Sequence, residues 1–239
     1  MSKVELHRRT SERHARPTLL SNFILGGQDG LVNVLGVILG VSAATNDIRI
    51  IFVAAFAALG AEAISMGAVA YTSTLARRMH YLKEEQRERF EMRDTPETER
   101  KEVEDIFKRW GYSGKELRVM TDNICSNKKA WLEFMMAHEL NLSPVGKSDA
   151  RDSFVVVLSS TVFGSVLPIL PFLYFTSNIL YGVESSIAIS AIALFIIGAY
   201  EAKSTVGSIW RRGLQMLVIG MVAGFAGYLI GRFFGAVPA

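Results

Sequence analysis

Five apolar segments constrain the fold of this chain more than any other feature of its sequence. A helix needs about 20 apolar residues to cross the roughly 30 Å hydrocarbon core of a bilayer, where it satisfies its own backbone hydrogen bonds. Because the segments are long enough, the sequence predicts an all-α integral membrane protein with five transmembrane helices. The predicted spans cover about residues 19–44, 48–76, 154–175, 183–202 and 213–234.

Charged residues are concentrated between the second and third of these segments. Of the 26 basic and 23 acidic residues, 15 and 14 lie within residues 77–147. We therefore predict a polar insert at residues 77–150, flanked by membrane segments at residues 19–76 and 151–239. Other basic residues cluster before the first span and between the fourth and fifth. By the positive-inside rule, this places the N-terminal segment, residues 1–18, and the insert in the cytoplasm.

The insert is predicted to form three helices that end at turn-forming residues. The first continues the second span and stops before Asp94. Thr95 and Pro96 suit the N-cap and the first position of the second helix, which ends at Gly111. After a short further segment, the last helix covers about residues 127–143. The expected architecture is thus a five-helix membrane protein with a cytoplasmic three-helix insert between the second and third spans.

Asp29 lies deep in the first predicted span. It follows the start of the span by ten residues, or about 15 Å, and a carboxylate there costs roughly 2.5 to 3.5 kcal/mol on insertion scales. Met66 on the second span lies at a similar depth, and a carboxylate with a thioether suits a borderline transition metal. Glu62, one turn from Met66, is a candidate proton carrier. The alternatives are a structural hydrogen bond from Asp29, for example to Asn33, and a core position for Met66.

Glutamates and methionines recur at helical spacing in the insert. The glutamates form pairs three residues apart, so each pair projects from one face of its helix, and the turn at Thr95 brings two pairs together. The last helix adds two methionines and a glutamate, a combination that suits Fe²⁺, Mn²⁺, Zn²⁺ or a similar ion. The candidate ligands are Glu88, Glu91, Glu99, Glu102, Met135, Met136 and Glu139. The alternative is an ordinary solvated face, with Met135 or Met136 in the core.

Several classes of function are disfavoured by motifs that the sequence lacks. The HELNL segment at His138 has no second histidine for a zinc-protease site, and there is no Glu-x-x-His pair, Cys-x-x-Cys or phosphate-binding loop. The only cysteine, Cys125, cannot form an internal disulfide. The basic residues are explained by positions that flank spans rather than by nucleic-acid binding. We therefore predict no enzyme activity, no organic cofactor and no nucleic-acid partner, with lipid around the spans.

Glycines recur at spacings that suit close helix packing. Gly36 and Gly40 lie four residues apart in the first span, and a longer series fills the last span. Small residues at these spacings let helix backbones approach each other in membranes, so we interpret them as packing positions rather than ligand sites. The series in the last span is Gly220, Gly224, Gly227, Gly231 and Gly235.

Four segments together resemble the vacuolar iron transporter family. They are DGLVNVLGVILGVSAA in the first span, AISMGAVAY in the second, WLEFMMAHELNL at the end of the insert and PILPF in the third span. The resemblance covers nearly the whole chain. It implies five membrane helices per subunit, a homodimer with the transport path along its interface, and a cytoplasmic three-helix domain that gathers metal.

The resemblance also implies roles for particular residues. Members of the family move Fe²⁺, and in some cases Mn²⁺, out of the cytosol in exchange for protons. Asp29 and Met66 match the membrane metal site of the family, and the seven insert residues named above match its cytoplasmic ligands. The chain departs from the family at Ala70, where many relatives have an acidic residue before the aromatic that is Tyr71 here. Glu62 is then the expected residue for proton coupling.

The sequence therefore favours a proton-coupled Fe²⁺ transporter, an antiporter in which Asp29 releases its metal on protonation, because a neutral carboxylic acid is a poor ligand. Three alternatives stay open. They are a membrane-anchored iron sensor or buffer without transport, a membrane di-iron oxidase that uses the insert carboxylates, and a carrier with Mn²⁺ as the main substrate. Short termini without a sorting extension favour a prokaryotic cell membrane, with the vacuolar membrane as the location in a eukaryote.

Overall fold

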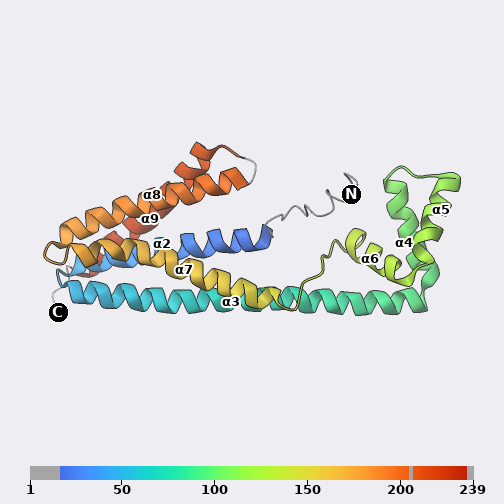
Figure 1. Ribbon diagram of the computed structural model, residues 1–239, viewed down its shortest axis with the longest axis horizontal. Coiled ribbons are helices and arrows are strands. Elements are labelled where there is room, and N and C mark those ends of the chain that lie inside the picture. The colour runs from blue at the N-terminus through green and yellow to red at the C-terminus, as the bar shows by residue number, and fades with distance from the viewer. Residues whose placement is uncertain (1–16, 205–206, 236–239) are drawn as a thin grey trace, which may run out of the picture. The chain divides into compact units, whose positions relative to one another are not determined.

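The computed structural model describes residues 17–204 and 207–235, and its regular elements in these ranges are all helices (Figure 1). The eight helices are α2 (Pro17–Ala44), α3 (Ile48–Asp94), α4 (Pro96–Arg109), α5 (Gly114–Cys125), α6 (Lys128–His138), α7 (Asp149–Tyr174), α8 (Ile179–Ser204) and α9 (Ile209–Gly235). The predicted N-terminal segment, residues 1–18, lies outside the described residues except for its last two, which begin α2.

Five of these helices are long and apolar enough to cross a membrane, as predicted. They are α2, α3, α7, α8 and α9, and they follow the order of the predicted spans. The last three begin four or five residues before the predicted starts, at Asp149, Ile179 and Ile209. The chain is therefore a multi-pass membrane protein.

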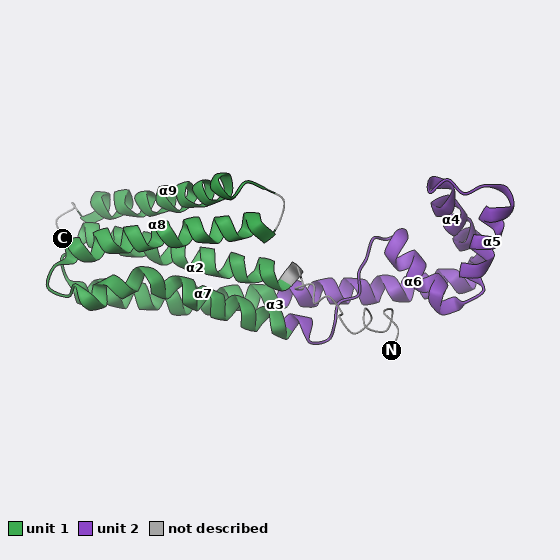
Figure 2. Cartoon of the chain, turned by 45° about the horizontal axis from the view of Figure 1, so that its top comes forward, with its two compact units in different colours: residues 1–71, 151–239 green, residues 72–150 purple. Residues whose placement is uncertain are grey.

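The chain divides into two compact units (Figure 2). The first contains residues up to Tyr71 and from Arg151 onward, and the second contains Thr72–Ala150. Helices α2, α7, α8 and α9 belong to the first unit apart from the first residues of α7, and α4, α5 and α6 belong to the second. Each candidate site described below lies within one unit.

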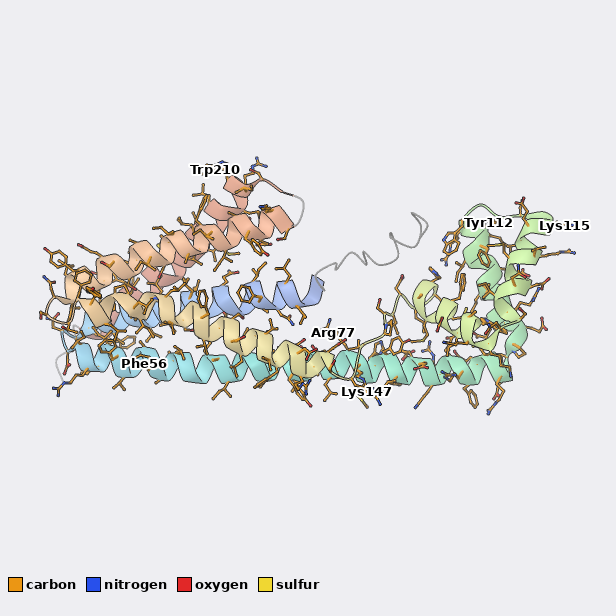
Figure 3. The ribbon with its side chains drawn as sticks, viewed as in Figure 1. Phe56, Arg77, Tyr112, Lys115, Lys147 and Trp210 are labelled. Atoms are coloured by element: carbon orange, nitrogen blue, oxygen red, sulfur yellow. The ribbon has the colours of Figure 1, made fainter. Side chains whose placement is uncertain are left out.

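Helix α3 is too long to lie entirely inside a bilayer. Its 47 residues extend about 70 Å at 1.5 Å per residue, more than twice the roughly 30 Å of the hydrocarbon core. Its run of charged residues begins at Arg77, which Figure 3 labels on α3. Because so many charges cannot remain in hydrocarbon, the part of α3 from Arg77 to Asp94 lies outside the membrane-spanning segment.

Helix α2 packs against α7, α8, α9 and the part of α3 that belongs to the first unit. Val34 and Ile38 are buried together with Ile51 of α3 and with Ile169 and Phe172 of α7. Helices α8 and α9 also contact α2. Contacts with several neighbours fix the orientation of α2, and with it the positions of the polar side chains that it carries.

Helices α2 and α9 cross at glycines that we interpreted from the sequence as packing positions. A Cβ atom on Gly227 would overlap the Gly36 carbonyl group, and one on Gly231 would overlap the Gly40 carbonyl group. A Cβ atom on Gly40 would lie 3.0 Å from the Gly227 carbonyl oxygen. The backbones of the two helices are therefore in direct contact, and the packing role is confirmed at these positions.

Aromatic and aliphatic side chains form the core of the second unit. The rings of Phe107 on α4 and Phe134 on α6 lie 5.1 Å apart, and Trp110 and Tyr112 meet Phe107 edge-on. Such ring pairs add to the gain from burial. The buried core consists of Val103, Ile106, Phe107, Trp131, Phe134 and Met135.

Helix α6 ends at His138, earlier than the sequence predicts. Asn141 adopts the left-handed region with φ of 53°, and the Leu142 N–H donates to the Met136 carbonyl group at 2.8 Å. A left-handed residue of this kind closes a helix, and asparagine tolerates it better than most residues. Glu139 is consequently the C-cap residue of α6.

Candidate metal sites

A polar cluster joins α2 and α3 within the first unit. The Asn33 side-chain amide donates to the Glu62 carboxyl group, and the Asp29 side chain is also hydrogen-bonded to Glu62. The cluster therefore holds two acidic groups between two helices that are long enough to span a membrane.

Met66 extends this cluster along α3. It lies four residues after Glu62, so it shares a face of the helix with that carboxyl group, and it is partly buried. A thioether on the same helix face as a carboxylate can contribute to a mixed soft and hard ligand set. From the sequence, Asn33 is expected only as a partner of Asp29, whereas in the structure its amide bonds to Glu62.

Three glutamates converge in the second unit. Glu88, Glu99 and Glu139 each offer one carboxylate oxygen, and these oxygens all lie within 4.8 Å of one another. Glu88 comes from α3 and Glu99 from α4, and their exposed fractions are only 1% and 4%. Glu139 comes from the end of α6 and is exposed over part of its surface. The structure thus brings together three of the predicted ligands, which we call the carboxylate cluster.

The carboxylate cluster is electrostatically unfavourable when its members are ionised. One oxygen of Glu88 and one of Glu99 are buried with no hydrogen-bond partner in the described part of the chain. Burial, a hydrogen bond with Glu99 and repulsion from nearby carboxylates raise the pKa of Glu88 to about 8. Burial and repulsion from Glu102 and Glu99 raise the pKa of Glu139 to about 7. A divalent cation would supply the missing partners and favour the ionised form.

Two further predicted ligands lie beside this cluster. The Glu102 side chain is hydrogen-bonded to Glu139, and burial followed by repulsion from Glu99 raises the pKa of Glu102. Glu91 is half-buried, and its carboxylate lies 3.5 Å from Nε of Arg87. Glu102 therefore contacts a member of the carboxylate cluster, while Glu91 forms an ion pair with Arg87.

Arg87 is a residue of this region that sequence reasoning did not single out. Its guanidinium lies 2.8 Å from the Glu84 carboxylate in addition to its contact with Glu91. The side chain of Glu84 is largely buried. Spacings of three and four residues along α3 are the signal that could have predicted both ion pairs.

The two candidate methionines are fully buried. Met135 has an exposed fraction of 0% and packs in the core with Phe107 and Phe134, and Met136 has an exposed fraction of 2%. The structure gives Met135 the core position that the sequence analysis considered as an alternative. A metal-ligand role for either thioether stays a prediction.

The metal-free protein is expected to lose stability as pH rises from about 5 to 8. The ordinary carboxyl pKa of 4.5 is raised in the folded state at Glu88 and Glu139, so the folded state binds more protons than the unfolded state in this range. Stability is therefore full below about pH 4.5 and is lost as pH rises through the folded values. The Glu88→Gln substitution should raise the free energy of unfolding at pH 8 by about 2 kcal/mol, because glutamine cannot ionise.

Thermal unfolding of the full chain in a chelator, followed at several pH values by tryptophan fluorescence, measures this effect. The matched control is Glu133→Gln on α6, whose side chain is 67% exposed and pairs with Lys129. It should leave the pH dependence of the unfolding temperature unchanged. A Glu88→Gln protein with the same pH dependence as the wild type would contradict the expectation.

Comparison with known proteins gives matches across both units. The VIT family model matches residues 20–232. Vacuolar iron transporter 1 of Oryza sativa subsp. japonica is 30% identical over 223 residues, which cover 93% of this chain and 88% of the relative. Vacuolar iron transporter 1 of Arabidopsis thaliana is 29% identical over 227 residues, or 95% and 90% of the two chains. The vacuolar iron transporter of Plasmodium berghei (strain Anka) is 29% identical over 222 residues, or 89% and 81%.

Proposed function

Because this chain belongs to the VIT family, we propose that it transports iron across a membrane, with Fe²⁺ as substrate and protons moving in the opposite direction. The relatives are named as transporters, and neither their names nor the family indicates an enzyme. This is evidence against the alternative of a membrane di-iron oxidase. Export of Fe²⁺ from the cytosol is the proposed direction.

The observation that carries this proposal is the contact between the carboxyl groups of Asp29 and Glu62. They belong to α2 and α3, which are both candidate membrane spans. Acidic groups at membrane depth are costly, and membrane proteins use them in ion and proton pathways. Together with the thioether of Met66, they would offer Fe²⁺ a ligand set that Ca²⁺ and Mg²⁺ do not prefer.

Protons and metal compete for this carboxyl pair. The carboxyl groups of Asp29 and Glu62 interact with each other, and a divalent cation would compete with protons for them, because carboxylate ligands bind metal in their ionised form. Protonation from the opposite side would then release the metal. Glu62, which also accepts from Asn33, is the proposed proton carrier. This competition couples metal movement to proton movement in opposite directions.

We assign metal gathering to the second unit, within the predicted cytoplasmic insert at residues 77–150. Two buried oxygens of the carboxylate cluster have no hydrogen-bond donor among the described residues, and Glu102 is linked to the cluster through Glu139. Such a site binds a divalent cation best when its carboxyl groups are ionised. Its proposed role is to raise the local Fe²⁺ concentration before transport, with Mn²⁺ and Zn²⁺ as further ions that it would accept.

A second copy of the chain is proposed to complete the membrane site. In the single chain Asn33 is exposed, and Asp29, Glu62 and Met66 are only partly buried. Polar groups facing lipid are costly, whereas the same cluster on a second copy would cover them and supply a second set of ligands. A homodimer with the transport path along its interface accounts for this exposure.

Fe²⁺ uptake into sealed liposomes that contain the purified protein and an internal pH dye tests the proposal. Under an imposed proton gradient, we expect Fe²⁺ to enter as protons leave, and the same assay with Mn²⁺ compares the two substrates. Metal binding without flux would instead favour the alternative, a membrane-anchored iron sensor or buffer. Uptake of Fe²⁺ with no proton movement would rule out the antiport mechanism.

A further inference from the structure

An arginine of α3 lies beside the predicted metal ligands of the second unit. The Arg87 guanidinium uses Nη1 to contact the Glu84 carboxylate at 2.8 Å and Nε to contact the Glu91 carboxylate at 3.5 Å. Glu84 precedes Arg87 by three residues and Glu91 follows it by four, so the three side chains share one face of the helix. A permanent positive charge is therefore paired with a candidate metal ligand.

The two ion pairs of Arg87 differ in exposure. The side chain of Glu84 is 11% exposed, whereas that of Glu91 is 40% exposed. An ion pair with a largely buried carboxylate is screened less by water and salt than a pair on the surface. Glu84 therefore anchors the guanidinium, and the longer contact with Glu91 is the one that a competing cation breaks more easily.

Glu91 lies beside the carboxylate cluster without taking part in it. The three oxygens that lie within 4.8 Å of one another come from Glu88, Glu99 and Glu139, and Glu91 contributes none of them. Its charge nevertheless reaches the cluster. Burial is the largest cause of the raised pKa values of Glu88 and Glu139, and repulsion from Glu91 adds to both. Glu91 is thus close to the cluster but paired with Arg87.

The charge of Arg87 also acts on a member of the cluster. Burial and repulsion from other carboxylates raise the pKa of Glu139 to about 7, and Arg87 opposes this shift by favouring the ionised form. A cation that attracts these carboxylates repels any metal ion bound between them, and a divalent ion feels twice the repulsion of a monovalent one. Arg87 therefore opposes metal binding in two ways, by pairing with Glu91 and by repelling the ion.

We propose that Arg87 limits the metal affinity of the carboxylate cluster, so that a bound ion is handed on rather than retained. The inference rests on the metal-gathering role proposed above. A group of ionised carboxylates holds a divalent cation more strongly as more of them take part. A site that gathers metal for transport also has to release it. Arg87 competes with the ion for Glu91 and pairs with Glu91 again when the ion leaves, so it is a positioning residue rather than a ligand.

Mn²⁺ binding to the full-length protein in detergent tests this role without any transport measurement. The Asp29→Ala protein serves as the parent, because it lacks the proposed membrane site. Titration calorimetry at pH 8, above the pKa of about 7 for Glu139, limits competition from protons at that residue. Adding Arg87→Gln should make Mn²⁺ bind about three- to tenfold more tightly. Release of bound Mn²⁺ into excess chelator should slow by a similar factor.

The direction of this change separates the proposed role from a structural one. A substitution that only damaged the second unit would weaken Mn²⁺ binding, whereas the proposal predicts stronger binding. Arg87→Lys, which keeps a positive charge at the same position, should restore most of the parent affinity. The matched control is Arg89→Gln, which removes an equal charge two residues away, where the side chain is 62% exposed and contacts Glu85 at 2.6 Å. It should leave Mn²⁺ affinity unchanged.

Unchanged or weaker Mn²⁺ binding in the Arg87→Gln protein would overturn the inference. Equally strengthened binding in the Arg89→Gln control would also overturn it, because the effect would then follow from net charge alone. Failure of the metal-gathering role itself gives a different result. The parent would then bind no Mn²⁺, or would bind it equally well after Glu99→Gln removes a member of the carboxylate cluster, and both proposals would fall together.

Discussion

The Asp29→Ala protein is expected to show Fe²⁺ uptake no higher than protein-free liposomes. The substitution removes a proposed metal ligand and leaves Glu62 with the Asn33 amide as its remaining partner in the cluster. One carboxyl group then has to hold a divalent cation that two would otherwise share. Folding should persist, because Asp29 is only partly buried and its loss removes an acidic group from the membrane. The initial rate of Fe²⁺ uptake is the quantity to measure.

Two further variants make this result specific. Asp29→Asn keeps a polar side chain of similar size without the charge, and we expect it to be inactive as well. Glu184→Ala removes a carboxyl group from another candidate span, α8, where the side chain is exposed, and it should transport at the wild-type rate. A well-folded Asp29→Ala protein with normal uptake would exclude Asp29 from the transport mechanism.

The Gly231→Ala substitution is expected to destabilise the first unit by about 1–3 kcal/mol. A Cβ atom at Gly231 would overlap the Gly40 carbonyl group, with the Gly40 Cα only 2.8 Å away. These are backbone atoms of α2, so no side chain can rotate to make room. The two helices would have to separate, and their close contact would be lost along several turns.

The same substitution on the facing helix provides the control. A Cβ atom at Gly36 would lie 3.9 Å from the nearest heavy atom, the carbonyl oxygen of Ala223, which is ordinary van der Waals contact. Gly36→Ala should therefore be neutral or slightly stabilising, because alanine is a better helix former than glycine. Thermal unfolding in detergent, followed by circular dichroism, compares the two. Equal unfolding temperatures would show that the backbones of α2 and α9 are not in direct contact at Gly231.

The spans could be predicted from the sequence because apolar length is a property of each segment by itself. Contacts between segments are different, since they depend on which helices become neighbours. The hydrogen bond from Asn33 to Glu62 is one example, because nothing in either segment specifies the other. The glycines on either side of Asp29 are another. Cβ atoms on Gly26 and Gly30 would overlap α7 atoms near Thr161, so this part of α2 is shaped by a helix far away in the sequence.

The carboxylate cluster was only partly predictable. Pairs of glutamates three residues apart around the turn at Thr95 indicated that Glu88 and Glu99 would meet, and the structure brings both together with Glu139. Whether the Met135 side chain points into the core or toward the glutamates could not be inferred in the same way. Its position depends on packing against Phe107 across the bundle, and spacing along one helix gives no information about that partner.

Under the proposed function, the carboxylate cluster also makes the cellular lifetime of the protein depend on its own substrate. The cluster is a local weakness in the metal-free state, because Glu88 and Glu99 each keep a buried oxygen with no hydrogen-bond partner in the part of the chain that the structure describes. A ligand that binds only the folded state lowers the unfolded fraction in proportion to its concentration, and proteolysis acts mainly on that fraction. Copies made when iron is scarce should therefore be degraded sooner than copies made when it is plentiful. Abundance would follow iron supply without any change in gene expression.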